Sequence, residues 1–189
     1  MRRVVVYELM SLDGVAEEPG DWVFDVDERV FTHLGEVIGQ QDLVLLGRRT
    51  HASWAGYWPT SDVQPFADFV NGTPEHVITS TPLDGSWSGA VAVRTPLLEH
   101  VRALRAGEGG DVGVHGSLSV ARSLLTAGLV DELRLVVAPT VAGRGRRLFE
   151  DQELRRLRLV TAEPTPSGCL LLTYRPAVDA GADAALPPA

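Results

Sequence analysis

The chain has 189 residues, of which 44% are hydrophobic and 22% are charged, values typical of a soluble globular protein with a single domain. The formal net charge of −8 argues against a general nucleic-acid binder, which needs a basic face. No apolar run approaches the roughly 20 residues that cross a bilayer, and the strand-like start of the chain argues against a signal peptide. We therefore expect a cytoplasmic protein without a membrane or nucleic-acid partner.

Hydrophobic spacing predicts strands and helices that largely alternate up to about residue 138. The predicted strands are 4–9, 43–46, 76–79, 90–93, 111–114, 133–138, 157–161 and 169–174. The predicted helices are 27–40, 48–57, 96–105 and 118–125. This order predicts an α/β fold with a mostly parallel central sheet flanked by helices, which an antiparallel C-terminal hairpin completes.

The same pattern predicts one domain over residues 1–175. From Pro176 onward the chain consists mainly of alanine, proline, glycine and aspartate. Such a composition buries too little apolar surface to fold, so residues 176–189 are predicted to form a disordered tail.

The segment Gly47–Thr50 is the first candidate binding site, because it follows an apolar strand and begins a predicted helix. Free N–H groups at a helix start attract anions. The guanidinium groups of Arg48 and Arg49 pair well with phosphate oxygens. Alternatively, the two arginines are solvated residues at an ordinary strand–helix turn, and other parts of the chain have to decide between these interpretations.

Two further strand ends carry suitable residues. Thr79–Thr81 offers three hydroxyl groups, which can bind phosphate or ribose but also occur in ordinary turns. His115–Ser117 lies where a strand meets a helix start, and Gly116 allows a ligand to approach the backbone closely. Because ligands of open α/β sheets bind at the carboxyl ends of the strands, the three segments together favour a nucleotide-like ligand.

The residues present disfavour several other chemistries. All 17 basic residues are arginine, so a Walker-type phosphate loop and a Schiff-base enzyme both lack their lysine. Gly143–Leu148 begins like a dinucleotide fingerprint but lacks its third glycine, and no Gly-x-Ser-x-Gly elbow occurs. Cys169 is the only cysteine and the histidines show no metal-ligand spacing, so no metal is expected.

Five segments in order resemble the dihydrofolate-reductase-like superfamily. They are Ser11–Gly14, Leu46–Thr50, Gly116–Ser117, Leu124–Leu133 and Pro139–Phe149. Within the superfamily, the chain is most similar to the reductase (C-terminal) domain of the bifunctional riboflavin-biosynthesis deaminase/reductase and to its stand-alone bacterial relatives. The likeness spans nearly all of residues 2–175, whereas the zinc-binding deaminase half is missing.

This resemblance implies an NADPH-dependent reductase of a flat nitrogen heterocycle, most like 5-amino-6-(5-phosphoribosylamino)uracil reductase. It implies that the loop around residues 13–16 closes over the nicotinamide and the substrate. It also assigns a set of residues to the phosphates, adenosine and nicotinamide of the cofactor. These residues are Gly47, Arg48, Arg49, Thr50, Thr79, Ser80, Thr81, Gly116, Ser117 and Leu118.

The catalytic residues stay open at this stage. Folate-reducing members of the superfamily use a carboxylate on the first helix, but the matching position here is Phe31 or a neighbour. Asp13 and Asp27 remain as candidate catalytic residues. Trp22 is a candidate for the wall of the substrate pocket, although aromatic residues at this density also form cores.

Two rival functions remain, namely a dihydrofolate or pterin reductase and a nucleotide-binding protein of the same fold without turnover. The riboflavin-type members pair through their sheets, so a homodimer is also expected. The apolar run Leu133–Ala138 is either part of that dimer contact or a buried central strand.

Overall fold

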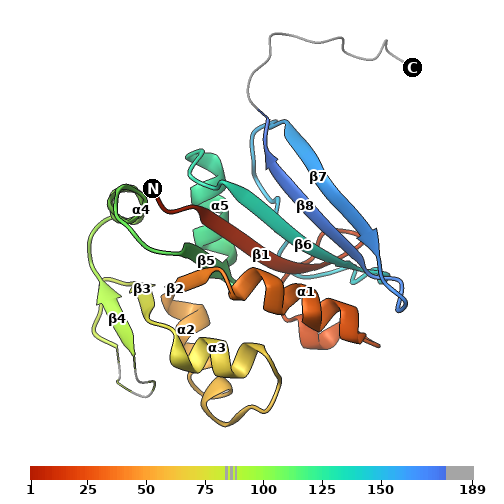
Figure 1. The fold of residues 1–189 in the computed structure, drawn as a ribbon, viewed down its shortest axis with the longest axis horizontal. Helices are drawn as coiled ribbons and strands as arrows, with labels where there is room; N and C mark the ends of the chain where they lie inside the picture. The colour runs from red at the N-terminus through yellow and green to blue at the C-terminus, as the bar shows by residue number, and fades with distance from the viewer. Residues whose placement is uncertain (84, 86, 88, 178–189) are drawn as a thin grey trace.

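The computed structural model describes residues 1–83, 85, 87 and 89–177, which form one eight-stranded sheet with helices on both faces (Figure 1). The strands are β1 (Val4–Ser11), β2 (Gln41–Gly47), β3 (Glu75–Ile78), β4 (Ala90–Val93), β5 (Asp111–His115), β6 (Glu132–Ala138), β7 (Leu157–Pro164) and β8 (Leu170–Pro176). The helices are α1 (Glu28–Ile38), α2 (Arg48–Trp54), α3 (Phe66–Gly72), α4 (Leu97–Ala106) and α5 (Leu118–Thr126). Two short 3-10 turns lie at Pro19–Asp21 and Trp58–Thr60.

The strand order is β4-β3-β2-β5-β1-β6-β8-β7. The pairings among β4, β3, β2, β5, β1 and β6 are all parallel, whereas β8 runs antiparallel to both β6 and β7. This confirms the predicted mostly parallel sheet with an antiparallel C-terminal hairpin. It also places the carboxyl ends of β1, β2 and β5 next to one another at one edge.

The core has two layers because neighbouring residues of a strand point to opposite faces of the sheet. In β2, Leu43 and Leu45 pack into the cluster that α4 and α5 cover, while Val44 and Leu46 pack into the cluster on the other face. The helices α1 and α3 cover that second face. Strands buried on both faces explain why the sequence shows continuous apolar runs rather than alternation.

Caps at the helix ends account for two boundaries. The carboxylate of Asp27 accepts hydrogen bonds from the backbone N–H groups of Arg29 and Val30 and so begins α1, and its second oxygen accepts from the N–H of Ser167 in the β7–β8 turn at 2.8 Å. Gly128 follows the end of α5 with φ +66°, the left-handed conformation in which glycine often ends a helix.

Helix α3 was not predicted from the sequence, because its seven residues span too few turns to show a clear helical period. The run Leu133–Ala138 lies in β6 between β1 and β8 and is mostly buried. The fold itself therefore explains its apolar character, and the homodimer stays a prediction. Pro176, where the tail was predicted to begin, is the last residue of β8, and residues 178–189 lie outside the described residues.

Candidate active site

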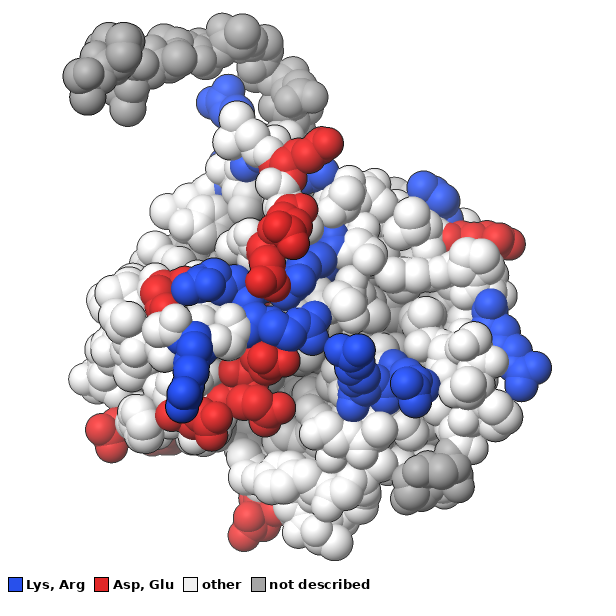
Figure 2. Space-filling view, turned by 180° about the vertical axis from the view of Figure 1, so that it is seen from behind, with Lys and Arg blue, Asp and Glu red and all other residues white. Residues whose placement is uncertain are grey.

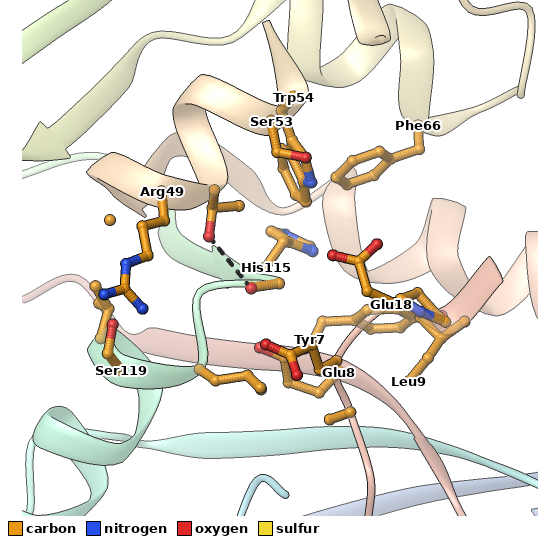
Figure 3. A pocket seen from close by; sticks show the side chains of 18 of the residues that line it. Tyr7, Glu8, Leu9, Glu18, Arg49, Ser53, Trp54, Phe66, His115 and Ser119 are labelled. Carbon is orange, nitrogen blue, oxygen red and sulfur yellow. Dashed lines mark hydrogen bonds between the residues drawn. The ribbon is translucent and has the colours of Figure 1, made fainter. Parts of the chain in front are cut away.

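A cavity of about 990 Å³ lies at the carboxyl edge of the sheet (Figure 3). Residues 7–9 of β1, Gly47 at the end of β2, and His115 and Gly116 at the end of β5 line it. Helix α2 and the first turn of α5 border one end, and α1 contributes to the other. Three parallel strands that end together therefore create the space, as expected for a ligand site in an open α/β sheet.

Two hydrogen bonds connect the segments that follow β2 and β5. The backbone N–H of Gly47 donates to the hydroxyl of Ser117 at 3.0 Å. The hydroxyl of Thr50 donates to the carbonyl oxygen of Gly116 at 3.3 Å (Figure 3, dashed line). These bonds hold the start of α2 against the start of α5, so the backbone N–H groups at the start of α5 are presented beside Arg49.

Arg48 and Arg49 are exposed, and neither makes an ion pair within the described part of the chain. Figure 3 shows the Arg49 guanidinium next to Ser119 of α5. Other arginines are paired, as Arg146 is with Glu17 at 3.8 Å. In Figure 2, basic and acidic side chains lie next to one another across the middle of the face drawn. The two unpaired guanidinium groups are therefore available to an anionic ligand.

A second, smaller cavity of about 360 Å³ continues the site along the sheet edge. Arg48 lines both cavities. Thr79 and Ser80, which follow β3, and Arg94, which follows β4, line the smaller one. With Thr95, which also lines it, the smaller cavity thus combines two guanidinium groups with three hydroxyl groups, a donor set that suits a phosphate monoester.

Gly116 brings the backbone close to the cavity. Its φ is +59°, and a Cβ atom added there would lie 2.8 Å from Cζ2 of Trp54. No larger residue fits without moving the indole. The sequence therefore needs glycine here for two reasons, the left-handed backbone and the space that Trp54 occupies.

The other end of the large cavity is aromatic. Trp54 and Phe66 form one wall, with ring centroids 5.5 Å apart and the planes at 87°. His115 lies 5.2 Å from Phe66, centroid to centroid. Val30, Phe31 and Leu34 of α1 also line this end. Such surfaces favour the binding of flat rings, because stacked or edge-on contacts bury a large apolar area.

The ionisable groups deep in the cavity are held neutral. Burial raises the pKa of Glu8 to about 8, although the backbone N–H of Gly116 opposes this by hydrogen bonding to the carboxyl. Burial lowers the pKa of His115 to about 3, and its Nε2 lies 2.7 Å from Oε1 of Gln41. Since an amide oxygen only accepts, Nε2 of the neutral imidazole carries the proton. Burial also raises the pKa of Tyr7.

The structure brings together most residues that the sequence assigned to a cofactor. Those that line the large cavity are Gly47, Arg48, Arg49, Thr50, Gly116 and Leu118. Thr79 and Ser80 line the smaller cavity. Two residues support these without lining either cavity: Ser117 accepts from Gly47, and the N–H of Thr81 donates to the Thr79 hydroxyl at 3.1 Å.

The three other candidates lie outside both cavities. Asp13 accepts from the Ser11 hydroxyl and from the N–H groups of Ala142 and Gly143, and these bonds, the Ser11 bond above all, lower its pKa to about 2. Asp27 caps α1. The indole of Trp22 is buried in the core and donates to the carbonyl oxygen of Glu17 at 2.8 Å.

Sequence reasoning missed Glu8, Ser119 and Arg94, which all line a cavity. A signal for Glu8 was present, because it is the one charged residue in the otherwise apolar run from Val4 to Met10. A charge inside a buried strand needs a specific reason. Arg94 gave no signal, since its distance from Arg48 depends on how β3 and β4 pair.

The fold and this edge-located cavity define a protein with the dihydrofolate-reductase-like architecture. Dihydrofolate reductase from Enterococcus faecalis, whose structure was solved as a complex with NADP(H), superposes with a TM-score of 0.63 over 92% of this chain and 96% of that one, at 16% identity. A putative riboflavin biosynthesis protein from Shewanella sp. PV-4 gives a TM-score of 0.73 over 93% and 99% of the two chains, at 18% identity.

The family follows from the sequence match. Residues 2–171 match the RibD C-terminal domain family, and the chain belongs to this family. The protein YyaP of Bacillus subtilis, itself described as uncharacterised, is 28% identical over 181 residues, which cover 92% of this chain and 94% of YyaP. These findings confirm the resemblance that the sequence segments carry.

Proposed function

We propose that this protein is an NADPH-dependent reductase that transfers a hydride to a nitrogen heterocycle, most like 5-amino-6-(5-phosphoribosylamino)uracil. The observation that carries the proposal is the cavity in which Gly47–Thr50 and Gly116–Leu118 meet beside an aromatic wall. Membership of the RibD C-terminal domain family supports it. NADPH, when bound, supplies a hydride from its nicotinamide ring. The protein therefore has to bind the cofactor and the substrate, orient them toward each other and exclude water.

The residues at one end of the cavity fit a pyrophosphate. Arg49 lies beside the start of α5, a helix of nine residues whose free N–H groups and positive dipole end favour an anion. Gly116 carries no side chain to block that approach. We assign the pyrophosphate to Arg49 and the first turn of α5.

The smaller cavity fits the phosphate that distinguishes NADPH from NADH. Arg48 and Arg94 supply two charged donors, and Thr79, Ser80 and Thr95 supply three hydroxyl groups. Because Arg48 borders both cavities, one extended ligand can reach from one to the other. We assign the adenosine 2′-phosphate to this group.

The aromatic end of the large cavity suits the substrate. Trp54, Phe66 and Phe31 offer apolar surface for a flat ring, and Ala16, which follows Gly14 in the loop predicted to close, also lines the cavity. Enclosure by these groups excludes water and holds the two rings against each other, which is the main service a protein gives to hydride transfer.

The test is oxidation of NADPH by the purified protein, followed by absorbance, with 5-amino-6-(5-phosphoribosylamino)uracil and dihydrofolate offered separately. We expect turnover of the pyrimidine. Turnover of dihydrofolate alone would instead make the protein a folate reductase. Tight NADPH binding without turnover of either compound would favour a nucleotide-binding protein of the same fold and overturn the proposed activity.

A further inference from the structure

Glu8 is a buried carboxyl group at the centre of the site, and only one of its two oxygens has a hydrogen-bond partner in the described residues. Its side chain is 3% exposed, and it lines the large cavity from β1. One carboxyl oxygen accepts from the N–H of Gly116. The other, Oε1, is buried without a hydrogen-bond partner in the described part of the chain. Figure 3 shows the carboxyl group of Glu8 beside Tyr7 among the side chains that line the cavity.

The surroundings keep a proton on this carboxyl group. Burying an unpaired carboxylate costs several kcal/mol, and burial accordingly raises the pKa of Glu8 to about 8. The other ionisable groups that line the cavity are Tyr7 on β1, His115 on β5, Glu17 and Glu18 on the loop before α1, Arg48 and Arg49 on α2, and Arg146 in the segment after β6. Tyr7 and His115 are held neutral by burial, and none of the eleven salt bridges in the described residues involves Glu8.

The other acids near the site are less suited to protonate a substrate. Asp13 and Asp27 lie outside the cavity and already accept several hydrogen bonds. Glu18 lines the cavity but is exposed to solvent. Glu17 also lines it, but it pairs with Arg146 at 3.8 Å and accepts a hydrogen bond from the Arg146 N–H. His115 uses its Nε2 proton on Gln41. Among the carboxyl groups considered, Glu8 alone combines burial, an oxygen without a partner in the described residues and direct access to the cavity. The hydroxyl of Tyr7 is also buried there without a partner, but burial raises its pKa above the ordinary value of 10, so it is the weaker acid.

We propose that Glu8 is the catalytic acid of this site and that the substrate is a compound with a C=N bond whose nitrogen faces Oε1 of Glu8. This inference rests on the proposed function. As the carbon of the C=N bond accepts the hydride that NADPH supplies, Glu8 gives its proton to the nitrogen. The O–H bond of Glu8 breaks, an N–H bond forms and the C=N bond becomes a C–N single bond. Glu8 is left as a carboxylate, which water entering the cavity protonates again.

The protonation state is tested first, without any substrate. Glutamate labelled with ¹³C at the carboxyl carbon is incorporated, and the protein bound to NADPH is titrated by NMR. Glu8→Gln assigns the Glu8 signal, and Glu75→Gln assigns that of Glu75, a buried carboxyl outside both cavities whose pKa burial also raises to about 8. We expect Glu8 to titrate near 8. Titration near the ordinary value of 4.5 would overturn the proposal.

Kinetics with 5-amino-6-(5-phosphoribosylamino)uracil then test the acid role, because opening of its ribose ring gives a C=N bond between C1′ and the amino nitrogen at C6. We expect kcat of the wild type to fall about tenfold per pH unit above the pKa of Glu8, because the acid form is lost. Glu8→Gln should lower kcat by roughly 10²- to 10⁴-fold and remove this alkaline decline. Glu8→Asp should keep the decline at a reduced rate, and Glu75→Gln should keep the wild-type profile.

Affinity for NADPH distinguishes an acid from a cofactor ligand. The dissociation constant of the Glu8→Gln variant should stay within about threefold of wild type, and circular dichroism should show an intact fold. A large loss of NADPH affinity, or a decline of kcat at alkaline pH that persists in Glu8→Gln, would overturn the inference. Neither result would contradict the proposed reductase activity. No turnover by the wild type would instead overturn the proposed function and the acid role with it.

Discussion

The hydroxyl of Ser117 accepts a hydrogen bond from the backbone N–H of Gly47 at 3.0 Å, so a side chain at the start of α5 holds the end of β2. The two residues are 70 positions apart in the chain. Ser117 is almost fully buried, and it connects the two segments that line the same end of the cavity. Removing the hydroxyl group therefore affects both the stability of the fold and the shape of the site.

We expect Ser117→Ala to lower the free energy of unfolding by about 0.5–1.5 kcal/mol, because the partly buried hydrogen bond from the Gly47 N–H is lost. It should also weaken NADPH binding, since Gly47–Thr50 loses its attachment to α5. Urea unfolding and NADPH titration measure the two effects. Thr126→Ala is the control, because its exposed hydroxyl bonds within α5 and to Gln152, away from both cavities. Equal effects of both variants would count against the special role of Ser117.

Gly116→Ala should disturb the site more than backbone strain alone explains. Its Cβ would meet Trp54 at 2.8 Å, and a left-handed backbone costs a non-glycine residue roughly 1–2 kcal/mol. Gly143→Ala is the matched control, with φ +75° and nothing within 4 Å of the added Cβ. We expect both variants to lose stability, but only Gly116→Ala to change the fluorescence of Trp54 and to weaken NADPH binding. Similar NADPH affinities of the two variants would contradict the close approach at Gly116.

Preference for NADPH over NADH should depend on Arg48 and Arg94. Each charge-assisted hydrogen bond contributes about 1.5–3 kcal/mol, so Arg94→Ala should weaken NADPH roughly tenfold to a hundredfold and leave NADH nearly unchanged. Arg48→Glu should act in the same direction and more strongly, because it reverses a charge. Isothermal titration with both cofactors gives the comparison. Equal losses of affinity for NADPH and NADH would contradict the assignment of the 2′-phosphate to the smaller cavity.

Glu75 should make the fold less stable at alkaline pH. It is 1% exposed, both carboxyl oxygens lack partners in the described residues, and burial raises its pKa from 4.5 to about 8. Between those two pH values the folded state keeps a proton that the unfolded state has released, so the free energy of unfolding falls as pH rises.

We therefore expect Glu75→Gln and the wild type to differ little in this pH dependence below pH 4.5, where both states of the wild type are protonated. Between pH 4.5 and pH 9 the wild type should lose on the order of 5 kcal/mol relative to the variant, because each pH unit between the two pKa values contributes about 1.4 kcal/mol. Urea unfolding across this range is the measurement. A constant difference between the two proteins would show that Glu75 keeps an ordinary pKa in the fold.

The sequence predicted every strand because each contains a short run of apolar residues between polar, proline or glycine-rich neighbours. Helices α1 and α5 were predicted from apolar positions that recur at the helical period, α4 from the proline at its start, and α2 from its place directly after an apolar strand. Helix α3 was missed because its seven residues are too few to show that period and, unlike the equally short α2, it does not directly follow a strand. The strand-end segments Gly47–Thr50 and His115–Ser117 could be predicted as candidate binding segments because parallel strands bring their carboxyl ends to one edge of the sheet, where ligands bind.

What the sequence could not predict depends on contacts between distant residues. Arg94 lines the same cavity as Thr79 and Ser80 only because β3 and β4 pair in parallel. Trp22 and Trp54 each follow a polar residue in the chain, yet one lies in the core and the other in the cavity wall. Whether Glu8 is ionised depends on how many buried atoms surround it, which is a property of packing rather than of chain order.

The central place of β1 has a consequence for how this chain is made. Its two neighbours are β5, where Val4 pairs with Val112, and β6, where Val5 pairs with Glu132. β1 therefore has neither partner until about 100 further residues have been synthesised. Such non-local pairing slows folding and leaves apolar strand surface open in the meantime. The nascent N-terminal segment is thus where we expect a chaperone to be needed most.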